Sequence, residues 1–137
     1  AGMADYCDLV HDHHFDANPD AAARGRAVAG LQAAHESKTL APLMEYLRAR
    51  NDIRLIGPTG TAGRVPTVAM KCDRPGHDLA VELAKYNIMT GGGDFYAVRL
   101  QEALGIDPTT GVLRLSFVHY TNDEEVQNLI KALDQVL

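Results

Sequence analysis

The sequence predicts an α+β fold, in which a small, mainly antiparallel sheet of about four strands packs against helices on one face. Two observations support this prediction. Helical segments fill the first third of the chain, and short strands then alternate with helices in the order β-β-α-β-α-β-α. In the last strand the large apolar residues point to one side only, so we expect the other sheet face to stay uncovered by this chain.

The composition narrows the function classes. A chain of 137 residues suits one domain, and no apolar run is long enough to span a membrane. The net charge of −5 and the absence of a basic stripe argue against nucleic acid as a partner. Cys7 and Cys72 lie far apart without a metal-type spacing, which indicates reduced thiols in a cytoplasmic protein.

The first half of the chain is expected to be helical. Residues 2–14 place apolar side chains at helical spacing, and Asp20 is a plausible N-cap for an alanine-rich helix over 21–31. A further helical run contains Leu40, Leu43, Met44 and Leu47. Because Pro42 lies near its start, we expect two pieces that are kinked or separate around residues 35–41.

Strands and helices alternate after this point. Residues 53–56 and 65–71 read as an antiparallel hairpin whose long tip is 57–63. A helix opens at 75–78 and ends near Tyr86, and a short strand over 88–90 runs into three glycines.

The remaining helices have clear boundary signals. Asp94 is expected to cap a helix on which Tyr96, Leu100, Ala103 and Leu104 share a face and which Gly105 ends. The last helix begins around Asp123, after Asn122, and carries an apolar stripe made of Val126, Leu129, Ile130, Leu133, Val136 and Leu137.

The strand over 112–120 is the most informative segment. Leu113, Leu115 and Phe117 point one way, whereas Val112, Arg114, Ser116 and Val118 point the other. An arginine in mid-strand on the non-core face is suited to clamp a carboxylate, because its planar fork donates two parallel hydrogen bonds. The alternative is a surface arginine paired with an acid on the neighbouring strand.

The two glycine-rich loops differ in what they indicate. Gly91-Gly92-Gly93-Asp94 permits close approach of the backbone to a ligand, although Asp94 would repel a phosphate. The alternative is a strained connection that needs positive φ. The segment 57–63 lacks the Lys-Ser/Thr ending of a phosphate-binding loop, so a flexible hairpin tip is favoured.

The histidines give weaker signals. His11 and His14 share a helix face, but without a third ligand at a diagnostic spacing a solvated helix end is favoured over a metal site. His35-Glu36 is compatible with a catalytic pair, and a helix junction is the favoured interpretation.

Cys72 is the one thiol beside basic residues. Lys71 and Arg74 are close enough in sequence to lower its pKa, yet nothing near it completes a nucleophile site. A buried or half-buried thiol is therefore favoured.

Four blocks of the sequence together resemble one family. They are residues 54–57 (Arg-Leu-Ile-Gly), 64–68 (Arg-Val-Pro-Thr-Val), 91–97 (Gly-Gly-Gly-Asp-Phe-Tyr-Ala) and 112–120. This series resembles the C-terminal small domain of class V aminotransferases, the fold-type I pyridoxal-phosphate enzymes that include cysteine-desulfurase-like proteins. The resemblance covers nearly the whole chain, and residues 112–120 are its most specific block.

The resemblance implies roles for particular residues. Arg114 corresponds to the family's arginine that binds the α-carboxylate of the amino-acid substrate. The segment containing Gly92 and Gly93 corresponds to the active-site mouth, which makes both glycines candidate substrate-binding residues. Ser116 and His119 are expected to support the site without taking part in chemistry.

This sequence departs from the family pattern in two places. Cysteine desulfurases carry their persulfide-forming cysteine in the loop that corresponds to 93–97, and this loop has none. An aminotransferase-, lyase- or epimerase-like member is therefore favoured. The order Tyr120-Thr121-Asn122 replaces the family's usual Tyr-Asn-Thr, which still leaves an N-cap for the last helix.

The cofactor machinery is the larger difference. Such an enzyme needs a lysine that binds pyridoxal phosphate, an aspartate on the pyridine nitrogen and a phosphate cup. None of the four lysines (Lys38, Lys71, Lys85 and Lys131) follows the family's pattern for the cofactor lysine. The resemblance thus implies a missing N-terminal large domain that carries the amino-acid chemistry, a homodimer when full length, and no cofactor binding or turnover by this chain alone.

The expected organisation is one domain over 1–137. Residues 1–16 would be the helix that leaves the large domain, and 17–137 would be the small C-terminal domain. If Met3 is instead a true start, the chain is a free-standing module that binds a small carboxylate or a protein on its open sheet face. A purely structural dimerisation domain, with an apolar patch in place of the site, is a third possibility.

Overall fold

The computed structural model describes residues 2–17 and 19–137. The elements follow in this order: α1 (Gly2–His14), α2 (Ala21–Ala49), β1 (Ile53–Ile56), β2 (Thr67–Cys72), α3 (Gly76–Ala84), β3 (Gly91–Gly93), α4 (Val98–Ala103), β4 (Val112–Ser116) and α5 (Asp123–Val136). Within these residues, no helix is long and apolar enough to cross a membrane.

The four strands form one sheet in the order β1-β2-β4-β3, and every pair is antiparallel. The hairpin β1–β2 pairs Ile53 with Cys72 at one end and Ile56 with Ala69 at the other. The expected α+β class and the small antiparallel sheet are confirmed.

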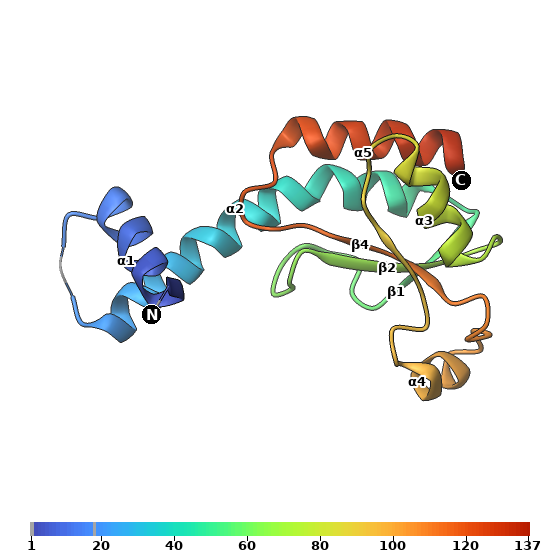
Figure 1. Cartoon of the computed structure of the whole chain (residues 1–137), viewed down its shortest axis with the longest axis horizontal. Helices are drawn as coiled ribbons and strands as arrows, with labels where there is room; N and C mark the ends of the chain where they lie inside the picture. Colours follow the sequence, from blue (N-terminus) through green and yellow to red (C-terminus); the bar gives the residue numbers. More distant parts are fainter. Residues whose placement is uncertain (1, 18) are drawn as a thin grey trace.

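One face of the sheet is covered by helices. The C-terminal half of α2 lies beside α5 over the strands, and α3 completes the layer, whereas α4 lies on the opposite side (Figure 1). The predicted alternation of β4 is confirmed from Leu113 to Ser116, where Leu113 and Leu115 are buried while Arg114 and Ser116 are exposed; Val112, expected on the Arg114 face, is also buried. The core under the helices contains Leu40, Leu43, Met44, Leu47, Val68, Met70, Leu79, Leu83, Leu113, Leu115, Val126, Leu129 and Leu133.

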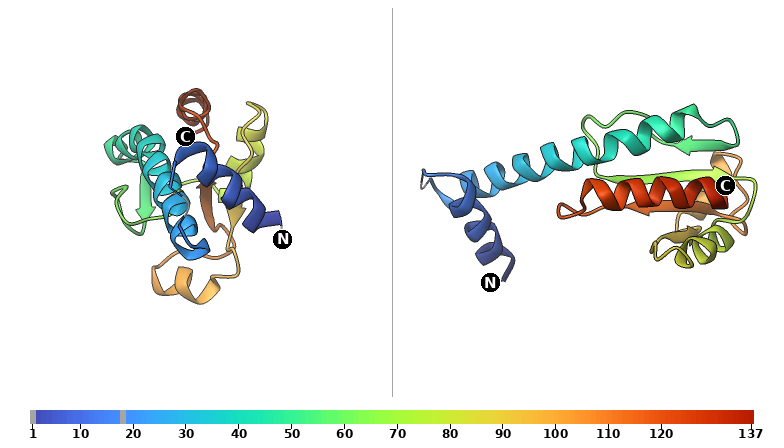
Figure 2. Two further views of the ribbon diagram at one scale, coloured as in Figure 1. Left: turned by 90° about the vertical axis from the view of Figure 1, so that its left-hand side faces the viewer. Right: turned by 90° about the horizontal axis from the view of Figure 1, so that it is seen from above.

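The N-terminal half of α2 extends beyond the sheet, and α1 packs against this extension (Figure 2). Asp8 of α1 accepts a hydrogen bond from Nε of Arg24 at 2.7 Å. The hydroxyl of Tyr6 lies 2.7 Å from Nε2 of His119, which joins α1 to the turn after β4. The predicted cap of α2 is confirmed, since the carboxylate of Asp20 accepts from the amide of Ala23 at 2.8 Å.

Of the two alternatives expected around residues 35–41, separate helical pieces are wrong, and a kink stays a prediction. The helix α2 runs through Pro42 without a break. Proline removes one backbone hydrogen bond, but buried apolar residues on both sides of it hold the helix to the core. His35 consequently lies in mid-helix instead of at a junction, and its Nε2 is 2.9 Å from the carbonyl oxygen of Thr121.

The third strand and its following helix also differ from expectation. The strand consists of Gly91–Gly93 themselves and not of residues 88–90. Asp94 does not cap α4, whose N-cap is Ala97; its carboxylate instead accepts from the amide of Tyr96 at 2.9 Å. Since α4 begins only at Val98, Tyr96 lies outside the helix.

The last helix begins as predicted. The side chain of Asn122 accepts from the amide of Glu125, and the carboxylate of Glu125 accepts from the amide of Asn122, each at 2.9 Å. This reciprocal capping box fixes the start of α5, which then buries Val126, Leu129, Leu133 and Val136.

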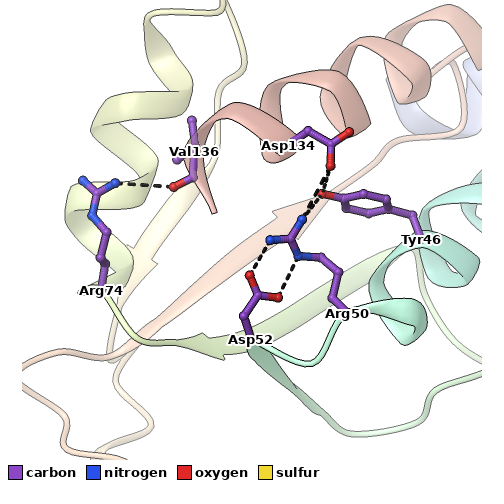
Figure 3. A network of polar contacts seen from close by, with 6 residues as sticks. All are labelled: Tyr46, Arg50, Asp52, Arg74, Asp134 and Val136. Atoms are coloured by element: carbon purple, nitrogen blue, oxygen red, sulfur yellow. Dashed lines mark hydrogen bonds and ion pairs between the residues drawn. The ribbon is translucent and has the colours of Figure 1, made fainter.

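A polar network ties the end of α2 to β1 and α5 (Figure 3). Arg50 donates to both carboxylate oxygens of Asp52 and, through Nη1, to the hydroxyl of Tyr46 at 2.7 Å. The Tyr46 hydroxyl donates in turn to Asp134 at 2.8 Å. Because Asp52 accepts charge-assisted hydrogen bonds from Arg50, its pKa is lowered.

Candidate functional site

The open face of the sheet carries the candidate site. Strand periodicity and the pairing register place on this face Arg54, Ile56, Thr67, Ala69, Lys71, Gly91, Gly93, Val112, Arg114 and Ser116. The hydroxyl of Thr67 donates to that of Ser116 at 3.3 Å, so Ser116 supports the neighbouring strand. Helices α2, α3 and α5 contribute nothing to this face because they cover the other one (Figure 1).

Arg114 lies in the middle of this face without an acidic neighbour. Its cross-strand partners are Ala69 on β2 and Gly91 on β3. No residue that the structure describes makes a hydrogen bond or an ion pair with its guanidinium group. The alternative of a surface arginine paired with a cross-strand acid therefore does not hold within the described chain.

One described side chain contacts the guanidinium group of Arg114. Its Cζ lies 4.0 Å from the centre of the Phe95 ring, which is a cation–π contact. Such a contact covers a face of the planar group and uses none of its N–H donors. The hydrogen-bonding edges of Arg114 thus remain available to an anion.

Two further cations share the open face with Arg114. Arg54 and Lys71 are direct cross-strand partners, and like charges in this position are unfavourable. Their polar groups are turned to backbone oxygens: Arg54 donates to the carbonyl of Leu104 at 2.9 Å, and Lys71 donates to the carbonyl of Cys72. The strand residues of this face thus include three cations and no acid, and Arg114 is the cation among them whose donors have no described acceptor.

The glycines of β3 have different neighbours. Gly92 faces the helices, and a Cβ at this position would lie 2.0 Å from the carbonyl oxygen of Gly76. This gives Gly92 a packing reason to be glycine, because β3 crosses close to the start of α3. Gly93 has a φ of +137° and lies on the open face. That either glycine contacts substrate stays a prediction.

The loop after β3 holds aromatic side chains where a desulfurase would have its cysteine. Phe95 is half-buried against Arg114, whereas Tyr96 is 103% exposed. Neither Cys7 nor Cys72 lies in this loop.

The expected influence of basic neighbours on Cys72 is outweighed. Burial raises the pKa of its thiol to about 11, while Lys71 opposes this effect only in part. A protonated thiol in the core is a poor nucleophile, so the interpretation as a buried thiol is the one that the structure supports.

The histidine candidates do not assemble a site either. His11 is buried and stacks on Phe15 with ring centres 5.1 Å apart. In the ranges 2–17 and 19–137, no three His, Cys, Asp or Glu side chains are grouped so that they could hold a metal ion.

The residues of this chain do not fit the cofactor expected for the family. A pyridoxal-phosphate site needs a lysine near an aspartate and a phosphate cradle. Lys71 is directed to a backbone carbonyl, Lys85 pairs with Glu82 at 2.8 Å, and Lys131 lies on α5 on the helical side of the sheet. We therefore derive no chemical step through the cofactor from these residues.

A groove lies away from Arg114. A hollow of about 690 Å³ opens between residues 86–90, the end of β4 and α5. Arg114 does not line it, and its lining side chains come mainly from the helix-covered side. The size of this groove is thus no argument for placing the carboxylate site there.

Sequence reasoning placed Arg114 correctly on the open face and missed its contact with Phe95. The contact depends on the pairing of β3 with β4, which brings Gly91 opposite Arg114. The sequence offers one signal for this contact: Phe95 is an aromatic residue that follows the three glycines of β3, and β3 is the neighbour of the strand that carries Arg114.

Comparison with known proteins places the chain in one family. The family described as "Aminotransferase class-V" matches residues 27–129. A curated relative, "Aminotransferase-like protein FGM3" of Gibberella zeae, is 37% identical over 109 residues, which are 77% of this chain and 27% of the relative.

Solved structures agree with this assignment. The cysteine desulfurase CsdA from Escherichia coli is 27% identical with a TM-score of 0.60, over 88% of this chain and 31% of that protein. A cysteine desulfurase from Thermococcus onnurineus NA1 is 25% identical with a TM-score of 0.70, over 84% of this chain and 28% of that protein. The chain thus spans less than a third of each of these relatives, and the expected family is confirmed: this chain belongs to the class V aminotransferases.

Proposed function

We propose that this chain is the substrate-carboxylate half of a pyridoxal-phosphate enzyme, in which Arg114 holds the α-carboxylate of an amino acid. The observation that supports the proposal is the guanidinium group of Arg114, which is exposed on an uncovered sheet face and has no described hydrogen-bond acceptor. Carboxylates match the planar fork of arginine and accept two parallel hydrogen bonds from it.

The role of Arg114 in this proposal is orientation. A carboxylate held at two points cannot rotate freely, so the bonds at the substrate's Cα keep a fixed direction relative to the rest of the site. Gly93 would border the substrate on the open face, with the backbone of Gly92 next to it, and Ser116 would hold β4 in place through Thr67. When bound, pyridoxal phosphate supplies an electron sink at Cα.

The cofactor and its lysine would belong to a large N-terminal domain that covers the open face. The coverage of less than a third of each relative's length supports a partner of this kind. In the proposal the complete protein is a homodimer, and this chain alone neither binds the cofactor nor turns over substrate.

The reaction proposed is transamination, elimination or epimerisation. The two structural relatives named above are cysteine desulfurases. The loop over 93–97 has Asp94, Phe95 and Tyr96 in place of a cysteine, and the thiol of Cys72 is buried with a raised pKa. A persulfide route through this loop therefore lacks its nucleophile.

The proposal is tested on the protein encoded by the complete reading frame. The protein is loaded with pyridoxal phosphate and mixed with a panel of amino acids while the cofactor absorbance is followed. We expect Arg114→Ala to lower kcat/KM for the best amino acid roughly 100-fold, because two charge-assisted hydrogen bonds are lost. The cofactor absorbance before addition of the amino acid should stay unchanged.

Arg26→Ala is the matched control, since it removes an exposed arginine on α2 away from the sheet. Equal kinetics of Arg114→Ala and the wild type would contradict the assignment of Arg114. A reading frame that stops just before residue 1 would contradict the large-domain partner and favour a free-standing binding module.

A further inference from the structure

We propose that Phe95 is a positioning residue that holds the guanidinium group of Arg114 by stacking on its face, so that its N–H edges stay free for a carboxylate. The inference rests on the proposed function of Arg114 and adds a specific device for it.

The stack is close, and the described residues offer this guanidinium group no other ring contact, hydrogen bond or ion pair. The Cζ atom of Arg114 lies 4.0 Å from the centre of the ring. Arginine side chains have several rotatable bonds, and an exposed one without a contact samples many directions. A ring against its face restricts these directions while the in-plane donors remain unoccupied.

Gly91 makes room for the ring. It is the cross-strand partner of Arg114, and a Cβ added to it would lie 3.0 Å from two atoms of the Phe95 ring. Contacts that short are tighter than normal packing. The absence of a side chain at Gly91 thus lets the ring settle beside β4, over Arg114.

The backbone adopts an unusual conformation to deliver the ring. Phe95 and Tyr96 have φ values of +52° and +59°, in the left-handed region that bulky residues rarely enter. Two consecutive non-glycine residues in this region persist only where the surroundings enforce them, and such strain collects at functional sites.

Several hydrogen bonds enforce this conformation. The Asp94 carboxylate accepts from the amide of Tyr96 at 2.9 Å. The side-chain amide of Gln101, which is 4% exposed, donates to the carbonyls of Gly93 and Asp94 at 3.2 and 3.1 Å. The backbone is thereby held on both sides of Phe95, and this restricts where its ring can lie.

An aromatic ring suits this task better than an acid. A carboxylate beside Arg114 would also order it, but would occupy the donors that the substrate needs. The ring contributes order without competing for those donors. Within the described residues, no acid forms an ion pair with Arg114.

The test follows the Arg114 side chain by NMR in the 137-residue chain, with acetate as the carboxylate probe. The variants are Phe95→Leu, which removes the ring, Phe95→Tyr, which keeps it, and Gly91→Ala, which forces it to move. Phe15→Leu is the matched control, because it makes the same change where the ring stacks on His11. Backbone spectra establish that each variant is folded.

We expect the wild type and Phe95→Tyr to show an upfield ring-current shift and restricted motion of the Arg114 Nε–H group. Phe95→Leu should abolish both and weaken acetate binding roughly threefold to tenfold. Gly91→Ala should reduce the ring-current shift with the ring still present. Phe15→Leu should match the wild type in every readout.

Two failures are distinguishable. The proposed function of Arg114 fails if acetate does not bind to the wild type, or if it binds equally well to Arg114→Ala. In that case the ring-current shift and the mobility of the Nε–H group still show whether Phe95 stacks on Arg114. If Arg114→Ala loses binding but Phe95→Leu binds acetate like the wild type, the positioning role is overturned and the function of Arg114 stands. A mobile, unshifted Nε–H group in the wild type would overturn the stack itself.

Discussion

Two arginines on this small fold have opposite surroundings. Arg50, at the end of α2, donates to Asp52 and Tyr46 and lies 3.5 Å from Asp134, so its donors are engaged by its own chain (Figure 3). Arg114, on the open face, stacks on Phe95 and has no described acceptor. The first ties elements together, and the second is arranged to meet a group from outside.

This difference shows what an arginine contributes in each place. An arginine whose N–H donors are hydrogen-bonded within its own chain stabilises the fold, because removing it leaves its acceptors unpaired. Free donors on an uncovered face contribute little to folding and are available for binding. The residue type alone does not show whether an arginine stabilises the fold or is available for binding. The register of the sheet shows this for Arg114, because it places the side chain on the open face.

The sharpest contrast in stability is expected within β4 itself. Leu113 is fully buried and adjacent to Arg114 in sequence. Leu113→Ala should lower the free energy of unfolding by about 2–5 kcal/mol, because it leaves a cavity under the helices. Arg114→Ala should lower it by at most about 1 kcal/mol, the value of one exposed cation–π contact. Urea unfolding of both variants measures the difference, and equal losses would remove the distinction between the two faces.

The next effect compares the arginines directly. Arg50→Ala should lower the free energy of unfolding by about 1–2 kcal/mol, discounted for the partial exposure of its acidic partners. Since Arg50 is remote from the open face, acetate binding by the chain should not change. A loss of acetate binding in Arg50→Ala, with the fold intact, would mean that the two regions are coupled.

A further effect is a pH dependence on the core side. Burial raises the pKa of Cys72 from 9.0 to about 11, so the folded state favours the neutral thiol. The resulting stabilisation is complete below pH 9.0 and is lost as the pH rises through about 11. The wild type should therefore lose stability more steeply across this range than Cys72→Ala does.

The free energy of unfolding is measured in urea at a series of pH values for the wild type and for Cys72→Ala. The difference between the two proteins removes the contribution of the other titrating groups. Parallel curves would show that the thiol titrates alike in the folded and unfolded states. In that case Cys72 would not be the inert core residue described above.

Much of the fold was predictable because strong local signals agreed with tertiary packing. The alternation in 112–117 gave the faces of β4, and the Asn122 signal gave the start of α5. The hairpin followed from the element order, whereas the open face is only partly bare, since α4 lies on that side and Val112 on it is buried. These features depend on residues close in sequence, where periodicity and capping act.

The errors arise where distant packing overrides a local signal. Pro42 indicated a break, but the core on both sides keeps α2 continuous. The strand over 88–90 was misplaced because glycines have low strand propensity, although here their missing side chains let β3 lie against α3. Asp94 was interpreted as a helix cap, since its turn with Tyr96 uses the same side-chain chemistry.

For the site, the sequence supplied Arg114 and its face but not its neighbours. The Phe95 stack depends on positive φ angles in the loop and on cross-strand register, neither of which has a periodic signature. The network around Arg50 joins residues separated by up to 88 positions. Contacts of this kind are set by the assembled fold.

One measurement tests most directly whether Arg114 holds a carboxylate. In the protein encoded by the complete reading frame, binding of the best amino acid is compared with binding of its amide, for the wild type and Arg114→Ala. The account predicts that the wild type prefers the acid by roughly 100-fold and that the variant shows no preference, which isolates the arginine–carboxylate pair. An undiminished preference in Arg114→Ala would show that another group binds the carboxylate.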